Sequence, residues 1–121
     1  MMLNKWIKAI LSVVVATGLI AFLGHNYINY VEKKQQVVSI TKTTKKTLFF
    51  YRDDCSDCQS IFHHVYWKNV FNDNVQFINM NQSKNRKYIS EYDLTSVPTF
   101  VKESERYSGT DVKKIDEIMG D

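Results

Sequence analysis

Two cysteines separated by two residues are the strongest chemical feature of this 121-residue sequence. Cys55 and Cys58 are its only cysteines, and they follow an apolar, strand-like run at residues 48–51. Apolar side chains then recur at helical spacing: Cys58, Ile61, Phe62, Val65, Tyr66 and Val70. The pattern predicts a helix that begins at Cys55, and one helical turn would hold the two sulfurs within disulfide reach.

A cysteine at the N-terminus of a helix is suited to thiol–disulfide exchange. The unpaired backbone N–H groups and the helix dipole stabilise a thiolate there, and the thiolate is the attacking species. Cys55 would form a mixed disulfide, and Cys58 would resolve it from a short distance. The spacing therefore predicts redox chemistry that needs both cysteines.

Two other interpretations of the cysteine pair remain open from the sequence. A zinc site needs four ligands, but there is no second CxxC, and His63 and His64 lie on the same predicted helix as Cys58. A purely structural disulfide would constrain only a short segment of the unfolded chain and would stabilise the fold weakly. We expect the redox role, with no bound metal and no cofactor.

The single proline of the chain marks a second element of the site. Pro98 follows Val97 and opens a strand-like run that continues to Val101. Proline cannot donate to a sheet ladder, so it belongs at a strand start or in a turn. Together with the preceding strand, CxxC and helix, this order resembles the thioredoxin superfamily, whose members place a cis-proline loop against the CxxC disulfide. The resemblance covers residues 47–121.

The resemblance implies a role for each residue of the site. Cys55 would be the exposed attacking cysteine and Cys58 the buried resolving one. The backbone of Val97 would pair with an extended substrate segment, and Pro98 would shape the substrate groove. Membrane-tethered proteins of this kind resemble accessory factors that form or correct disulfides in secreted peptides such as bacteriocins.

The chain departs from thioredoxins at three places. Asp54 stands where they have an aromatic residue, and Ser56-Asp57 stands where they have Gly-Pro. The run at residues 48–51 lacks the buried acid that in thioredoxins handles the proton of the resolving cysteine. We therefore do not expect a fast, general cytosolic reductase.

The expected fold class is α/β, a small thioredoxin-like fold with a central mixed sheet flanked by helices, behind an N-terminal transmembrane helix. Residues 74–80 should form a buried strand, and residues 83–92 a polar helix with Tyr88 and Ile89 facing inward. Residues 104–109 should form a hairpin turn with a short edge strand around Arg106 and Tyr107.

A final helix should begin near Thr110 or Asp111, either of which can serve as its N-cap. Its inward positions should be Val112, Ile115, Ile118 and Met119. The N-terminal strand that thioredoxins usually carry is reduced to residues 37–40 at most.

The N-terminal region is long and apolar enough to cross a membrane. A helix from Trp6 to Tyr27, at 1.5 Å per residue, would span the roughly 30 Å hydrocarbon core. Both of these aromatic residues suit the interfaces. A cleavable signal peptide is the alternative, but no convincing small-x-small site follows. We expect an uncleaved anchor at residues 1–30, a basic polar linker at 31–46 and a thioredoxin-like domain at 47–121.

Charge is divided unevenly along the chain. Residues 1–46 contain seven Lys and one Glu, a net of +6, whereas residues 47–121 contain nine Lys or Arg and twelve Asp or Glu, a net of −3. The lysines suit a solvated linker attracted to anionic lipid, and the acidic domain argues against nucleic-acid binding. The positive-inside rule favours a cytoplasmic domain. The very short leading tail and the use of a CxxC on exported proteins favour the extracytoplasmic side, which we expect.

Two functions of different class follow. The first is a membrane-anchored thiol–disulfide oxidoreductase that acts through the CxxC on exported or cell-surface proteins and exchanges electrons with a redox partner protein. The second is a thioredoxin-fold binding or assembly subunit of a membrane or secretion complex, in which the CxxC is incidental. A thiol–disulfide exchange assay distinguishes them.

Overall fold

The computed structural model describes residues 2–41 and 44–120, with side chains from residue 4 onward. The chain divides into two compact units, one that ends at Val31 and one that begins at Glu32. We describe each unit by itself.

The first unit is the helix α1 (Met2–Lys33) up to Val31, and the last two residues of this helix belong by their contacts to the second unit. Residues Asn4–Lys33 are long and apolar enough to cross a membrane, by length and composition. Large apolar side chains are exposed along the helix, with Ile20 at 70% and Phe22 at 64%. A helix that is apolar on all sides is stable only when something apolar surrounds it.

The second unit is built on a four-stranded mixed sheet in the order β2-β1-β3-β4. The strands are β1 (Thr47–Tyr51), β2 (Val75–Asn79), β3 (Thr99–Lys102) and β4 (Glu105–Ser108). β1 pairs in parallel with β2 and antiparallel with β3, and β4 returns antiparallel to β3. Every residue of β1 is buried. Its continuous apolar sequence is typical of a central strand that is covered on both faces.

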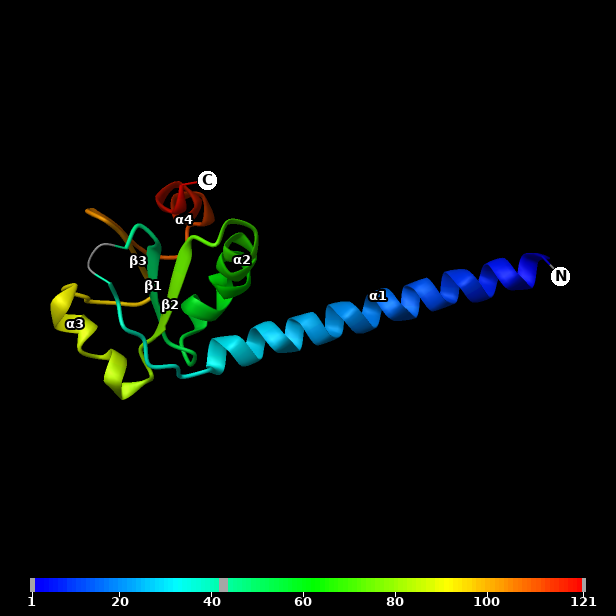
Figure 1. The fold of residues 1–121 in the computed structure, drawn as a ribbon, viewed down its shortest axis with the longest axis horizontal. Coiled ribbons are helices and arrows are strands. Elements are labelled where there is room, and N and C mark those ends of the chain that lie inside the picture. Colours follow the sequence, from blue (N-terminus) through cyan, green and yellow to red (C-terminus); the bar gives the residue numbers. More distant parts are fainter. Residues whose placement is uncertain (1, 42–43, 121) are drawn as a thin grey trace. The chain divides into compact units, whose positions relative to one another are not determined.

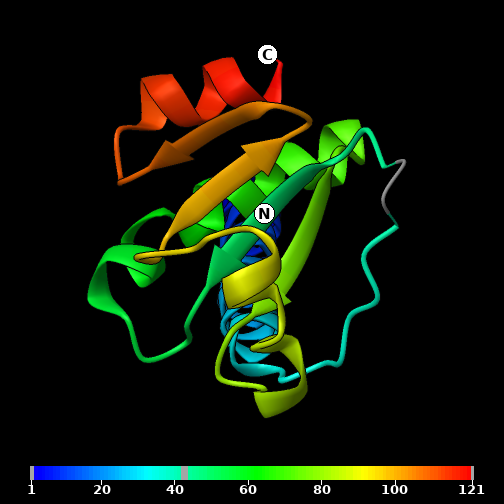
Figure 2. The same cartoon turned by 90° about the vertical axis from the view of Figure 1, so that its left-hand side faces the viewer.

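Helices α2 and α3 lie on opposite sides of the sheet (Figure 1). The first face packs against α2 (Ser56–Asn72), which connects β1 to β2, and against α4 (Val112–Met119). Figure 2 shows α4 lying along the β3–β4 hairpin. The ring of Phe49 is central to this face, stacked on Phe100 at 4.7 Å between centroids and 6.1 Å from Phe62 of α2.

The second face is covered by the segment after α1, a short 3-10 helix η1 (Ser83–Asn85) and the short helix α3 (Tyr88–Glu91). Its buried side chains form one cluster: Val38, Leu48, Phe50, Ile78, Met80, Tyr88 and Val101. Alternate residues of β1 thus serve the two faces, as the two-residue period of a strand requires.

The N-terminal strand considered at residues 37–40 does not form, but the segment is fixed to the domain. Val38 is buried; its N–H donates to Asn85 Oδ1 at 2.9 Å, and its carbonyl accepts from the Tyr88 hydroxyl at 2.8 Å. Asn85 Nδ2 also donates to the Gln36 carbonyl at 2.8 Å. Side chains thus satisfy backbone groups that a sheet ladder would otherwise satisfy.

The single helix expected at residues 83–92 is instead divided into η1 and α3. Asn85 lies in η1 with its amide turned into the domain, where it bonds the backbone of residues 36, 38 and 79. Tyr88 is buried as expected, whereas the expectation for Ile89 was wrong, because its side chain is 46% exposed.

Two other residues that we expected in the core are exposed, and the geometry of their helices explains why. Val70 is 51% exposed because the inward face of α2 continues from Val65 to Asn69, whose Oδ1 accepts from the Val75 N–H at 2.9 Å. Val112 is 42% exposed at the first position of α4. Asp111 is the N-cap of α4, and its side chain accepts from the N–H of Lys113 at 3.0 Å.

Candidate active site

The two cysteines lie where β1 passes into α2. Cys55 is the N-cap of α2 in an extended conformation, and its Sγ accepts from the Cys58 N–H at 3.2 Å. Cys58 occupies the first turn and is fully buried, whereas Cys55 is partly exposed, and both are free thiols. One sulfur is therefore open to a substrate and the other is not.

The environment of the two sulfurs differs electrostatically. Cys55 Sγ receives a backbone N–H at the positive end of a 17-residue helix, and both features stabilise negative charge on that atom. Burial raises the pKa of the Cys58 thiol well above its ordinary value, and the hydrogen bond with Cys55 raises it further. At neutral pH, Cys58 therefore holds its proton.

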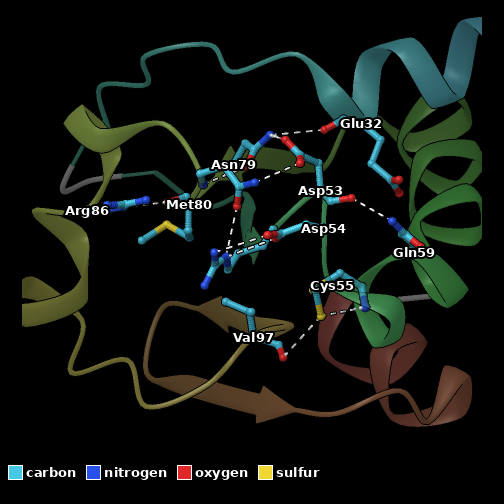
Figure 3. Close-up of polar contacts among 12 residues, drawn as sticks. Glu32, Asp53, Asp54, Cys55, Gln59, Asn79, Met80, Arg86 and Val97 are labelled. Carbon is cyan, nitrogen blue, oxygen red and sulfur yellow. Dashed lines mark hydrogen bonds and ion pairs between the residues drawn. The ribbon is translucent and has the colours of Figure 1, made fainter.

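The proline loop lies directly against the first cysteine, although the two are far apart in sequence. The Val97 carbonyl oxygen lies 4.0 Å from Cys55 Sγ, and Figure 3 shows it directed at that sulfur. The Val97–Pro98 peptide bond is cis, and β3 begins at the next residue. Thr99 Oγ1 donates to the Ser96 carbonyl at 2.6 Å and so closes the loop. The structure thus brings together Cys55, Cys58, Val97 and Pro98.

A hydrogen-bonded carboxylate fixes the loop that carries Cys55. Asp53 accepts from Asn79 Nδ2 at 2.9 Å through one oxygen and from Asn81 Nδ2 at 2.8 Å through the other. Its backbone carbonyl accepts from Gln59 Nε2 of α2 at 2.7 Å (Figure 3). Side chains from the end of β2 and from the first turns of α2 thus hold the residue two positions before Cys55.

The sequence analysis did not identify Asn79 and Asn81, although a signal for them exists. Asn79 ends β2 and Asn81 follows it, as Asp53 follows β1, and parallel strands bring their carboxyl ends to the same edge of a sheet. Two amides at the carboxyl end of one predicted strand and a carboxylate at the carboxyl end of its neighbour could have been paired on this ground.

Asp54, which replaces the aromatic residue of thioredoxins, is exposed and forms an ion pair with Arg52 at 3.3 Å. Arg52 Nε also donates to Asn81 Oδ1 at 3.0 Å. The entrance to the cysteine pair is therefore charged rather than aromatic.

β1 offers no carboxylate to the buried thiol. Tyr51 ends this strand with its side chain buried beside Phe62. Burial raises the pKa of Tyr51, and the nearby Glu32 and Asp53 raise it further, so the phenol stays neutral. The departure from thioredoxins noted in the sequence therefore persists in the folded strand.

Within residues 2–41 and 44–120, no group of three or more His, Cys, Asp or Glu side chains is arranged to hold a metal ion. His64 Nε2 instead lies 2.7 Å from Asp116 Oδ1 and connects α2 to α4. This histidine has a structural contact away from the cysteines.

Comparison with protein-family models and with curated proteins finds no match. Solved structures do match. The thioredoxin of Fasciola hepatica is 24% identical, with a TM-score of 0.53 over 63% of this chain and 80% of that chain. Mitochondrial thioredoxin 3 of Saccharomyces cerevisiae is 17% identical, with a TM-score of 0.54 over 64% and 79%. Thioredoxin f2 of Chlamydomonas reinhardtii is 19% identical, with a TM-score of 0.52 over the same shares.

Identities this low establish architecture rather than activity. The shared architecture agrees with what the structure shows independently: a mixed sheet between helices, and a CxxC pair at the N-terminus of the helix that follows its central strand. The chain therefore has a thioredoxin-like fold, as the sequence predicted.

Proposed function

We propose that this protein is a membrane-anchored thiol–disulfide oxidoreductase that acts on cysteines of exported or cell-surface proteins. The observation that carries the proposal is the asymmetry of the cysteine pair. Cys55 is partly exposed, receives an N–H on its sulfur and faces the Val97 carbonyl, while Cys58 is buried one turn away. An accessible attacking thiol and a shielded resolving thiol are what exchange through a mixed disulfide requires.

In the reducing direction, the Cys55 thiolate attacks one sulfur of a substrate disulfide. The substrate S–S bond breaks, a Cys55–substrate disulfide forms, and the other substrate sulfur leaves as a thiolate that takes up a proton. Cys58 then attacks Cys55 Sγ and transfers its own proton to the departing substrate sulfur. The products are a substrate dithiol and a Cys55–Cys58 disulfide; the same steps in reverse oxidise a substrate.

The cis-proline loop would position the substrate. Val97 presents its carbonyl beside Cys55 at the surface, and Pro98 is buried behind it at the start of β3. An extended substrate segment that paired with the Val97 backbone would lie along this loop with its cysteine over Cys55. A redox partner protein would use the same surface to restore the cysteine pair.

The anchoring part of the proposal is supported by α1, whose exposed apolar side chains and length suit a bilayer. We assign residues 1–30 to the anchor, 31–46 to a basic linker that can approach lipid headgroups and 47–121 to the redox domain. The cell membrane is the proposed location, with the domain on the extracytoplasmic side, where a CxxC can act on exported cysteines.

A binding or assembly role, with an incidental CxxC, is the second candidate. A patch of exposed apolar side chains on α2 favours it: Trp67 is 49% and Phe71 79% exposed, with ring centroids 6.4 Å apart. Exposed aromatic pairs of this kind occur in protein interfaces.

The two candidates are distinguished with the purified full-length protein in non-ionic detergent. We expect it to catalyse both the reduction of insulin disulfides by dithiothreitol and the oxidation of a dithiol peptide by oxidised glutathione. The Cys55→Ser variant, with its fold checked by circular dichroism, should be inactive in both. Wild-type rates equal to the uncatalysed background would favour the binding role.

A further inference from the structure

A pocket of about 330 Å³ opens beside the cis-proline loop. Its apolar wall comes from three elements: Met80 after β2, Ile89 of α3, and Leu94 and Val97 before β3. Ile89 was expected in the core from its helical spacing, and its exposure now has an explanation, because its side chain lines this pocket. The apolar wall can therefore receive an apolar side chain from a bound molecule.

The pocket adjoins the first cysteine through Val97. Val97 lines the pocket, and its carbonyl oxygen lies 4.0 Å from Cys55 Sγ. Figure 3 shows Val97 between Cys55 on one side and Met80 with Arg86 on the other. A polypeptide whose cysteine lies over Cys55 would therefore place its neighbouring residues in the pocket.

The charged residues of the pocket wall are both arginines, Arg52 and Arg86, and the described residues that line it include no carboxylate. Arg52 is already paired with Asp54 at 3.3 Å. Arg86 donates through Nε to the Met80 carbonyl at 3.2 Å, which orients its guanidinium, and it forms no ion pair with any residue that the structure describes. The wall thus carries one oriented cation whose charge is not balanced by a carboxylate.

We propose that Arg86 is a specificity-determining residue, which selects substrate segments that carry an acidic residue, next to an apolar one, beside the reactive cysteine. This inference rests on the proposed function. The oriented guanidinium matches a carboxylate in charge and geometry, and the apolar wall accepts the neighbouring side chain. Because Arg86 is exposed, we expect the carboxylate to raise the exchange rate about two- to fivefold, with the effect lost at high salt.

The test uses the full-length protein in non-ionic detergent and short peptides, each with one cysteine in a disulfide with thionitrobenzoate. When Cys55 attacks the peptide sulfur, the peptide becomes bound to Cys55 and thionitrobenzoate leaves as a coloured thiolate, which gives the second-order rate constant. In one peptide series, each peptide carries a single Glu at one of the four positions on either side of the cysteine, and a Leu stands next to that Glu. Matched series carry Gln or Lys in place of Glu.

At one or more positions we expect the order Glu, Gln, Lys from fastest to slowest. Arg86→Gln should remove the preference, Arg86→Lys should keep it, and Arg86→Glu should reverse it. Lys84→Gln is the matched control, since Lys84 is an exposed cation of the neighbouring η1 that does not line the pocket. It should leave the preference unchanged.

Three results would overturn the inference, and they can be told apart. Equal rates for Glu, Gln and Lys peptides at every position would reject the selection while leaving the proposed exchange activity intact. Equal slowing of all three series by Arg86→Gln would assign Arg86 a structural role through its bond to Met80. No exchange with any peptide would reject the proposed function as well.

Discussion

The side-chain amide of Asn79 donates to the carboxylate of Asp53 at 2.9 Å and so joins the end of β2 to the loop that carries Cys55. Asn79 is 2% exposed, and its amide nitrogen also lies 3.2 Å from the Glu32 carbonyl, while its Oδ1 accepts from the Asn81 N–H at 2.9 Å. One buried side chain thus connects Glu32, the end of β2 and the entrance to the site.

Replacing Asn79 with Ala should therefore destabilise the second unit. The change leaves Asp53 and the Asn81 N–H each without one partner, and buried polar groups left unpaired cost about 1–3 kcal/mol each. We expect a loss of roughly 2–3 kcal/mol in the free energy of unfolding, measured by urea titration with tryptophan fluorescence. Ser104→Ala, at an exposed turn position, is the control and should change stability by less than about 0.5 kcal/mol.

The two thiols should differ sharply in reactivity. Cys58 has no exposed surface, so in the reduced protein iodoacetamide should modify Cys55 first and Cys58 only on unfolding. Cys58→Ser should retain attack by Cys55 and accumulate mixed disulfides that dithiothreitol releases. Mass spectrometry of each alkylated cysteine gives the two rates; equal rates would contradict the assignment of attacking and resolving roles.

Stability of the reduced protein should fall at alkaline pH. Burial raises the pKa of Cys58 above its ordinary value of 9.0, so above pH 9 the unfolded chain releases a proton that the folded one retains. The slope approaches about 1.4 kcal/mol per pH unit for one group. Urea titrations between pH 8 and pH 10 should show this loss.

Cys58→Ala supplies the control for that pH dependence. It removes the titrating thiol, so its stability should change less across the same interval. The pKa of Tyr51 is also raised by burial, from an ordinary value of 10.0. Tyr51 therefore affects the pH dependence of stability mainly above this interval, and it does so in both proteins. Identical slopes for the two proteins would show that Cys58 is not the group responsible.

Asp57 should make the cysteine pair more reducing. Its carboxylate lies in the first turn of α2, whose N-cap is Cys55, and its negative charge repels negative charge on the Cys55 sulfur. Asp57→Asn removes this repulsion, stabilises the thiolate-bearing reduced form and should raise the potential by roughly 10 mV, as expected for about 0.5 kcal/mol in a two-electron couple. Equilibration with glutathione buffers measures the shift, and Glu105→Gln, an exposed carboxylate of β4, should leave the potential unchanged.

The side of the membrane can be tested in cells. We expect an impermeant protease to remove the redox domain from intact cells and the full-length chain to be in the membrane fraction beforehand. The use of a CxxC on exported proteins favours this orientation, and the lysines after the helix oppose it. Protection until lysis would place the domain in the cytoplasm, whereas a shortened protein in the medium would show that the helix is a cleaved signal.

The site was more predictable from the sequence than the second face of the sheet. A CxxC after a buried strand and a proline before another have local sequence signals, so β1, α2 and β3 could be located in advance. Helical spacing failed at Val70 and Ile89, because spacing identifies a face of a helix but not how far the sheet beneath it extends. At Val70, the neighbouring Asn69 occupied the inward position and bonded the backbone of Val75. At Ile89, the expected single helix was divided into η1 and α3, and Asn85 of η1 bonded the backbone of Val38.

The amides that complete the fold give no signal in the hydrophobic periodicity. Asn79 ends a predicted strand, and Asn81 and Asn85 lie in the polar stretch after it; their partners are up to 49 residues away. Whether a side chain hydrogen-bonds to a backbone group far away in the sequence depends on the tertiary fold. Hydrophobic periodicity reports only on local structure and cannot identify such a residue.

The attachment of residues 36–40 to the domain changes where the redox unit begins as a folding unit. A protein truncated at Thr47 would lose the buried side chain of Val38 and would expose the apolar surface around Leu48, Phe50 and Tyr88. It would also leave Asn85, which is fully buried, without its bonds to Gln36 and Val38. Cleavage in the lysine-rich stretch after Thr41, by contrast, would cut the chain, but noncovalent contacts would continue to hold residues 36–40 on the domain.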